Sequence, residues 1–324
     1  MTEVMDAAEL RRICLDAGAD DVGFAALDTP GLEGEVDYVR EALPSTRSLI
    51  AVCVRLSREN FRSRASSMVN TEIDTAIPVL DRIGHRISLA LQDRGHRALY
   101  PSVTFPVEAQ RLPSRGWTVS HKPVAVAAGL GHMGIHRCVI HPRFGSFIGL
   151  GTVLTEAEIA PYSQPIDWNP CLGCYLCVAA CPVGAIHNDG SFDFNSCYTH
   201  TYNQFVNNFA DWVEVMADSE DLDDYNQRMS PRETTMQSRR QYRSGYCVAV
   251  CPAGSEVIGP YLADRKNHLQ EVLRPLQRKP ENIYASPGSN AETHVRKRFR
   301  TKTVRHVDSG IMPPDGVDAA PEPQ

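Results

Sequence analysis

The chain has 324 residues, of which 42% are hydrophobic and 22% are charged, and its formal net charge is -6. This length can bury one full hydrophobic core and is sufficient for two. The acidic balance argues against a protein that coats its whole surface with nucleic acid, although it allows a local basic patch. No apolar run reaches the roughly 20 residues of a membrane-spanning helix, so an integral membrane protein is excluded. No apolar signal segment follows Arg11-Arg12, which predicts a cytoplasmic protein.

Helices and strands are expected to alternate over residues 1–160. Apolar spacing predicts a helix over 5–17, the β-branched run Ser48–Leu56 predicts a buried strand, and a second helix is expected from Pro78 to about Gly95. Further strand-like runs lie at 98–103, 138–140 and 147–154. This order predicts one α/β or α+β domain.

The ten cysteines fall into two groups. Without an export signal, structural disulfides are not expected. Cys14, Cys53 and Cys138 lie among apolar residues, which indicates small buried side chains. The other seven lie between Cys171 and Cys251 and indicate a metal region.

The first cysteine motif has the spacing C-x2-C-x2-C-x3-C-P and consists of Cys171, Cys174, Cys177, Cys181 and Pro182. Three thiolates on a tight loop can occupy three corners of a cuboidal cluster, and the x3 step starts a helix that carries the fourth thiolate away. Structural zinc sites usually combine two separated C-x2-C pairs. The spacing therefore predicts an iron–sulfur cluster.

The ending C-x3-C-P recurs at Cys247, Cys251 and Pro252, and Cys197 stands alone between the two motifs. The simplest assignment gives one [4Fe–4S] cluster the ligands Cys171, Cys174, Cys177 and Cys251. The second cluster then has Cys181, Cys197 and Cys247, and the two-residue step places its fourth position at Ser244. Four alternatives remain for the second cluster: it is serine-ligated, completed by another residue, a [3Fe–4S] cluster, or open at one iron.

A literal G-x-G-x-x-G occurs at Gly129, Gly131 and Gly134. The dinucleotide fingerprint requires a strand before the glycines and a helix after them, and here the expected order is reversed, so NAD binding is not predicted. Two interpretations remain. The glycines allow backbone to approach a large planar cofactor, or they form tight turns alone. His132, His136 and His141 lie on the same segment, where packing roles are expected more often than ligand roles.

This segment and its continuation through Gly145-Ser146 and Leu150–Thr155, followed directly by the cysteine motifs, resemble epoxyqueuosine reductases and the related corrinoid reductive dehalogenases. The resemblance implies a nitroreductase-like α/β domain that holds a corrinoid (cobalamin). It also implies a ferredoxin-like module that passes electrons from reduced ferredoxin or flavodoxin through two clusters to cobalt. The implied cofactor-binding residues are Gly129, Gly131, Gly134, Gly145, Ser146 and Thr155.

Three departures from the pattern are visible. Ser244 stands where the family has a cysteine, and the C-terminal helical repeats of some members are absent. His121 and Lys122 stand where relatives place an acidic proton donor. Reduction of a carbon centre consumes protons, and a histidine that titrates near neutral pH can deliver one, so His121 and Lys122 are the candidate catalytic residues. A solvent-facing His-Lys pair at a helix start is the alternative.

The expected organisation is a cofactor and substrate domain at 1–160, an iron–sulfur module at 161–262 with a helical insertion at 200–242, a C-terminal extension at 263–306, and a disordered tail at 307–324. Six cations and Phe299 lie within 294–306. This basic segment predicts a solvated face or a docking site for an acidic electron carrier, and a tRNA substrate would also need such a patch.

The predicted function is that of an iron–sulfur reductase. It would pass low-potential electrons to a bound cofactor, for reductive cleavage or deoxygenation of a small molecule or a modified base. About 160 residues precede the module, and a pocket for cofactor and substrate is an economical use for them. The alternatives are an electron-transfer or binding protein without corrinoid chemistry of its own, and a flavin-linked reductase.

Overall fold

The computed structural model describes residues 4–103, 117–171, 173–201, 216–229 and 245–307. The chain divides into two units. Unit 1 is formed by Met1–Leu56, Thr75–Leu172 and Ala253–Val257, and unit 2 is formed by Ser57–Asp74, Gly173–Pro252 and Ile258–Gln324. The division thus falls just after the first cysteine of the first motif, whereas the sequence indicated a boundary at residue 160.

A four-stranded antiparallel sheet forms the centre of unit 1. Its strand order is β2 (Asp21–Ala26), β3 (Ser48–Arg55), β7 (Ile148–Thr155) and β4 (Ala98–Leu99). β3 pairs with a neighbour on each side, and its residues are buried as far as Val54. A strand that is covered on both faces has a continuous apolar run, which explains why Ser48–Leu56 was predicted correctly.

One face of this sheet is covered by α5 (His121–Ala127). Val124 and Ala125 of α5 share a buried cluster with Leu49 and Ala51 of β3. Small residues on both sides allow this short helix to approach the strands closely. Helices and an antiparallel sheet are therefore combined in one unit, which confirms the α+β class, while the nitroreductase-like and ferredoxin-like assignments stay predictions.

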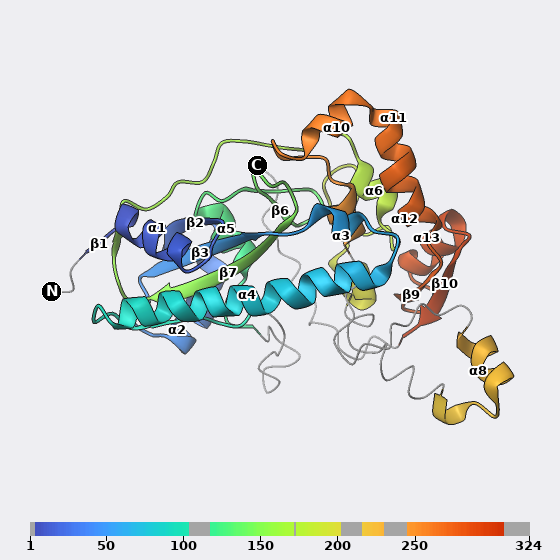
Figure 1. Ribbon diagram of the computed structural model, residues 1–324, viewed down its shortest axis with the longest axis horizontal. Helices are drawn as coiled ribbons and strands as arrows, with labels where there is room; N and C mark the ends of the chain where they lie inside the picture. Colours follow the sequence, from blue (N-terminus) through green and yellow to red (C-terminus); the bar gives the residue numbers. More distant parts are fainter. Residues whose placement is uncertain (1–3, 104–116, 172, 202–215, 230–244, 308–324) are drawn as a thin grey trace. The chain divides into compact units, whose positions relative to one another are not determined.

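The other face is covered by the part of α4 (Ser66–Gln92) that belongs to unit 1, from Thr75 onward (Figure 1). Its Leu80 lies against Gly149 and Gly151 of β7. α1 (Ala7–Asp16) lies beside α4, and Asp6 caps its N-terminus by accepting a hydrogen bond from Glu9 N at 2.8 Å. The helix predicted over 5–17 is thus confirmed.

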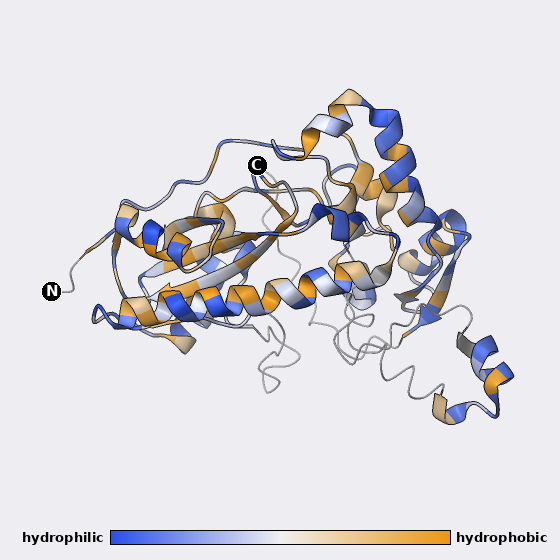
Figure 2. Ribbon diagram, viewed as in Figure 1, coloured by the Kyte–Doolittle hydropathy of each residue, from blue (hydrophilic) through white to orange (hydrophobic). Residues whose placement is uncertain are grey.

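The helix start predicted at Pro78 is wrong. α4 begins at Ser66 and contains Pro78 in its interior. Proline is favoured in the first turn of a helix, which made Pro78 a start signal. The apolar spacing continues upstream through Val69, Ile73 and Ala76, and Figure 2 shows hydrophobic and hydrophilic residues alternating along the whole helix.

Smaller elements complete unit 1. β1 (Met5–Asp6) pairs in parallel with β8 (Ile159–Ala160), and β5 (His132–Met133) pairs antiparallel with β6 (Val139–Ile140). The second pair is a hairpin inside the glycine-rich segment. The remaining described helices of the unit are η1 (Glu33–Glu35) and α2 (Val36–Ala42).

Two short helices of unit 2 carry the cysteine motifs. α6 (Leu176–Ala180) and α9 (Tyr246–Val250) pack against each other, and both contact η3 (Leu269–Leu273). η3 lies between α11 (Arg265–His268) and α12 (Arg274–Arg278). The other described helical segments of the unit are α3 (Arg58–Arg62), residues 194–201, α8 (Leu222–Met229) and α10 (Ile258–Ala263).

The C-terminal part of unit 2 is a β-α-β element. β9 (Glu281–Ala285) and β10 (Lys302–His306) pair in parallel, with Lys302 opposite Glu281, and α13 (Asn290–Arg298) connects them. Parallel strands cannot be joined by a tight turn, so the helix serves as the crossover. The sequence did not indicate this sheet. Across the described ranges, none of the helices is long and apolar enough to span a membrane.

Candidate iron–sulfur site

The first cysteine motif leads through a tight backbone reversal into α6. Gly173 and Tyr175 have positive φ angles of 73° and 51°. Cys174 is exposed, Cys177 is buried in α6, and Cys181 follows the helix with φ −61° and ψ 115°. The x3 step therefore does form a short helix, as the spacing predicts.

The second motif repeats this backbone pattern. Gly245 has a φ of 134°, α9 again has five residues with Cys247 in second place, and Cys251 follows with φ −65° and ψ 123°. Each motif thus has a residue of positive φ, a five-residue helix and an extended cysteine before proline. Because α6 packs on α9, the two C-x3-C-P endings are neighbours within unit 2.

Backbone amides donate to two of the sulfurs that were predicted as ligands. Ala185 N donates to Cys181 Sγ at 3.3 Å in unit 2, and Ile135 N donates to Cys171 Sγ at 3.5 Å in unit 1. Burial raises the pKa of the Cys181 thiol, although the surrounding N–H groups oppose this effect. N–H···S hydrogen bonds stabilise the negative charge of iron-bound thiolates. Cys171 and Cys181, with thiol side chains that accept hydrogen bonds from backbone amides, therefore fit an iron–sulfur cluster as ligands.

Of the ligands predicted for the second cluster, Cys197 is described by the structure and Ser244 is not. Cys197 lies in the helical stretch 194–201, with its Sγ 3.8 Å from Thr201 Oγ1. Ser244 lies outside the described residues, as does most of the insertion at 200–242. No disulfide joins any of the cysteines, all of which are described. In the described ranges, no three His, Cys, Asp or Glu side chains form a group that could hold a metal ion.

Side chains of neighbouring helices hold the ends of α6 and α9. The last carbonyls of a helix lack partners inside it, so other groups must satisfy them. Gln277 donates to Ala179 O at 2.9 Å. Arg62 Nε donates to Ala249 O, and His268 Nε2 donates to Val250 O, both at 3.0 Å. These bonds fix the backbone directly before Cys181 and Cys251.

The glycine-rich segment packs against the chain's own backbone. A Cβ atom would lie 2.4 Å from Gln164 O at Gly129, 2.4 Å from Ile140 O at Gly131, and 2.0 Å from Ala253 O at Gly145. At Gly134, it would lie 2.8 Å from a ring atom of His136. The structure therefore supports the interpretation as tight turns and close packing. A cofactor role for these glycines stays a prediction.

Ser146 and Thr155 are buried and have partners within the chain. Ser146 Oγ lies 3.3 Å from His136 Nε2, and Thr155 Oγ1 donates to Arg97 O at 2.9 Å. Cofactor binding by these two residues also stays a prediction.

His141 also has hydrogen-bond partners within the chain. Its Nδ1 accepts from Arg143 N, and its Nε2 lies 3.0 Å from Asp21 Oδ2. Burial by itself would raise the pKa of Asp21, but hydrogen bonds from His141 and Arg11 lower it to about 2. His141 is thus a packing residue of unit 1.

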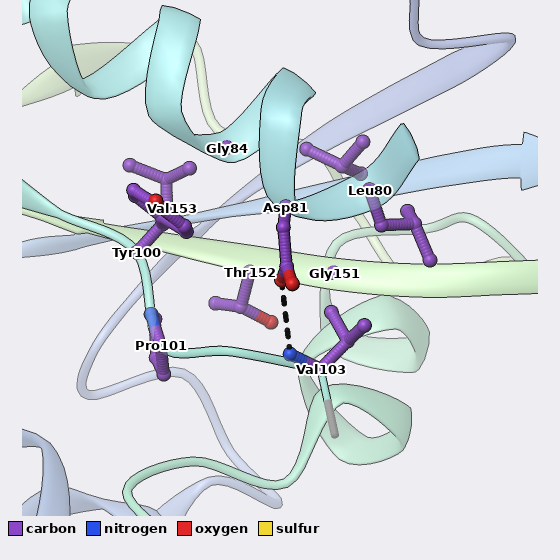
Figure 3. Close-up of a pocket in the computed structure, with 10 residues that line it drawn as sticks. Leu80, Asp81, Gly84, Tyr100, Pro101, Val103, Gly151, Thr152 and Val153 are labelled. Carbon is purple, nitrogen blue, oxygen red and sulfur yellow. Dashed lines mark hydrogen bonds between the residues drawn. The ribbon is translucent and has the colours of Figure 1, made fainter. Parts of the chain in front are cut away.

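A very small cavity lies between α4 and β7 in unit 1 (Figure 3). Figure 3 shows Asp81 pointing toward Val103. Its Oδ1 accepts a hydrogen bond from Val103 N at 3.4 Å. The cavity is lined by Val52, Leu80, Asp81, Gly84, Tyr100, Pro101, Val103, Gly151, Thr152 and Val153. Pockets for drug-sized ligands have volumes of roughly 300–1,000 Å³, and this cavity is far smaller, so it is not a corrinoid pocket.

The two candidate catalytic residues differ in their surroundings. His121 Nδ1 lies 2.9 Å from Thr152 Oγ1, so His121 contacts a residue of the cavity wall. Lys122 is exposed. The sequence analysis did not single out Thr152 or Asp81, because an isolated polar residue in an apolar strand or helix carries no motif.

The basic segment 294–306 is not uniformly exposed. Phe299 is buried, and the side chain of Lys302 is fully buried in an ion pair with Glu281 at 2.5 Å. Arg296 and His306 both pair with Glu292. The prediction of a solvated basic face is therefore wrong for Lys302 and Phe299. The sequence missed the buried pair because its two members are far apart in the chain.

Comparison with known proteins adds to this picture. Residues 165–187 match the family model of the 4Fe-4S binding domain. The chain is 35% identical over 91 residues to the epoxyqueuosine reductase of Bacillus cereus, which covers 28% of this chain and 23% of that protein. It is 26% identical over 190 residues to the enzyme of Gloeobacter violaceus, with 56% and 53% covered. The structure of epoxyqueuosine reductase from Streptococcus thermophilus aligns with a TM-score of 0.45 at 16% identity, over 82% of this chain and 74% of that one.

The cysteine motif thus defines a 4Fe–4S iron–sulfur protein, and the predicted iron–sulfur binding is confirmed for the first motif. The resemblance to epoxyqueuosine reductases is also confirmed by sequence similarity. The chain spans between about a quarter and about half of the length of these curated relatives.

Proposed function

We propose that this chain is an iron–sulfur oxidoreductase that carries electrons from a reduced carrier to a substrate. The observation that supports this proposal best is the repeated C-x3-C-P element, which occurs on two helices of the same length that pack against each other. A single-cluster or zinc protein has no need of the second element. The family match at 165–187 and the relatives' name support the same class of reaction.

The proposed ligands follow the sequence assignment. Cys171, Cys174, Cys177 and Cys251 would hold the first cluster, and Cys181, Cys197 and Cys247 would hold the second, with Ser244 as a candidate for its fourth position. Such clusters supply one-electron transfer at potentials that depend on hydrogen bonds to the sulfurs and on solvent exposure. The amides of Ala185 and Ile135 supply such hydrogen bonds, and burial of Cys177, Cys181 and Cys251 restricts access of water.

The substrate is proposed to be a small molecule or a modified base, as the name of the relatives indicates for those proteins. In this chain, Thr152 Oγ1 lies 2.9 Å from His121 Nδ1 on the α5 face of the sheet, whereas Asp81 lines the small cavity on the α4 face. His121 can move a proton to or from a group bound near Thr152. Lys122 is exposed and would act only on a substrate that approaches from solvent. Ferredoxin or flavodoxin is the proposed electron donor.

A corrinoid as second cofactor is a proposal that the resemblance alone supports. Gly129, Gly131 and Gly145 each face main-chain atoms, and the cavity is too small for a corrinoid. The packing of these glycines against main-chain atoms supports a second candidate function, in which the chain transfers electrons without corrinoid chemistry of its own.

Anaerobic reconstitution tests the proposed function. We expect about eight irons and eight sulfides per chain for two [4Fe–4S] clusters, with absorption near 400 nm. About seven irons indicate a [3Fe–4S] second cluster. A protein that binds zinc alone and lacks this absorption contradicts the proposal.

A second experiment separates the two candidate functions. The reconstituted protein is titrated with cobalamin, and cobalt is followed by EPR. A base-off Co(II) signal on binding supports the corrinoid-dependent reductase. Absence of cobalamin binding, with both clusters present, supports electron transfer without a corrinoid, and uptake of flavin instead indicates a flavin-linked reductase.

A further inference from the structure

We propose that the C-terminal β-α-β element, residues 281–306, is a clamp that positions the three cysteines of the second cluster. This inference rests on the proposed iron–sulfur function. The three cysteines lie on separate segments around Cys181, Cys197 and Cys247, and all belong to unit 2. Two of these segments are hydrogen-bonded to the clamp, and the third packs against it.

The first contact holds the segment of Cys247. Tyr246, directly before this cysteine, donates its phenol to Glu281 Oε1. Lys302 Nζ lies 2.5 Å from the same carboxylate oxygen and 3.3 Å from Tyr246 Oη, and it also donates to Leu276 O and Lys279 O. The side chains of Glu281 and Lys302 are 1% and 0% exposed. A buried ion pair with good hydrogen-bond geometry fixes its neighbours firmly, because losing one partner leaves an uncompensated charge.

The second contact holds the segment of Cys197. His200 lies one helical turn after this cysteine, and its Nδ1 accepts a hydrogen bond from Tyr284 N of β9 at 3.4 Å. The rings of His200 and Tyr284 are stacked, with centroids 6.4 Å apart. Burial, and then the charge of Lys302, lower the pKa of His200 to about 3. The ring is therefore neutral at physiological pH and keeps its acceptor nitrogen.

The third contact holds the segment of Cys181. His294 of α13 packs against the turn that follows this cysteine. Its ring lies directly over Gly184, where a Cβ atom would be only 2.6 Å from His294 Nδ1. Gly184 has a φ of 68°, so the turn after Cys181 is shaped to receive the ring.

One β-α-β element thus contacts three segments that are distant in sequence. Cluster ligands must hold a fixed geometry, and groups behind the ligands orient them. The clamp gives the C-terminal extension a role inside the iron–sulfur module. Lys302, counted by sequence among the cations of a surface patch, is central to that role.

The test compares the full-length parent with Tyr246→Phe, which removes one hydroxyl and keeps the ring. Both proteins are reconstituted anaerobically, and iron release to a chelator is followed together with EPR redox titration. A hydrogen bond to a charged group typically contributes enough to change an equilibrium by about tenfold or more. We expect iron of the second cluster to be released about tenfold faster, with a shifted potential, while the signals of the first cluster stay unchanged.

A second pair of variants keeps the inference testable. Lys302→Met removes the buried cation, and Lys297→Met removes an exposed cation from the same element. Selective loss of three or four irons in Lys302→Met, with parental values in Lys297→Met, supports the clamp. Parental behaviour of Tyr246→Phe and Lys302→Met, or equal loss of both clusters, overturns it. A parent that binds no cluster at all contradicts the proposed function instead.

Discussion

Replacement of Gly145 by alanine tests the packing of the glycine-rich segment. Gly145 has a φ of 65°, and an added Cβ would lie 2.0 Å from Ala253 O and 3.1 Å from Ala253 C. The left-handed conformation costs an alanine about 1–2 kcal/mol. Relief of the overlap needs movement of a backbone that is tied by Ser255 N to Pro142 O at 2.8 Å, and such overpacking costs about 1–3 kcal/mol more. The free energy of unfolding should therefore fall by roughly 2–5 kcal/mol.

Gly31→Ala is the matched control for this prediction. Gly31 also has a positive φ, of 90°, but nothing lies within 4 Å of its added Cβ. Both variants place an alanine at a positive φ and so share that conformational cost. Only Gly145→Ala also places its Cβ against Ala253. Thermal unfolding of the cluster-free protein should give a midpoint roughly 2–12 °C lower for Gly145→Ala than for Gly31→Ala, at about 2–4 °C per kcal/mol. Equal midpoints would refute the assignment of Gly145 to internal packing.

Three further predictions concern stability and thiol reactivity. Asp21 has a folded pKa of about 2 against an ordinary value of 3.8, so its ionisation stabilises the fold above pH 3.8, and this contribution is lost as the pH falls toward 2. Asp21→Asn should flatten the pH dependence of urea unfolding in that window, and an unchanged slope contradicts this. Leu10→Ala should cost about 2–5 kcal/mol, whereas Leu15→Ala, on the exposed side of α1, should cost far less in the same urea titration. Burial raises the pKa of Cys14 to about 12, and the charge of Arg11 opposes this only in part. Alkylation of the cluster-free protein at pH 8 should therefore modify the exposed Cys174 and leave Cys14 unmodified, which mass spectrometry of the labelled protein can check.

The elements that the sequence predicted well are those whose signal is local. The run Ser48–Leu56 is apolar because β3 is covered on both faces, and the cysteine spacing contains the whole geometry of a tight loop and a short helix. The start of α4 was misplaced because Pro78 is a strong local signal, and it outweighed the weaker periodicity before it.

The features that the sequence did not indicate depend on contacts between distant residues. Lys302 looks like one of six cations in a basic stretch, and only its pairing opposite Glu281 in β9 makes it a buried residue. Likewise, the glycines of 129–145 fit a cofactor cradle and a packed turn equally well in sequence. Gln164 and Ala253, which occupy the space beside Gly129 and Gly145, are far from them in the chain.

The two glycines of β7 under α4 have a consequence for how the cavity can vary. A Cβ atom at Gly151 would meet Val103 at 3.5 Å and Leu80 at 3.6 Å, both ordinary contact distances, and the backbone there needs no positive φ. At Gly149, the same atom would lie only 3.0 Å from Leu80. Position 151 can therefore accept a methyl group that narrows the cavity while the sheet stays intact, whereas position 149 resists it. A single substitution at position 151 is therefore enough to change the size of this cavity without a rearrangement of the sheet.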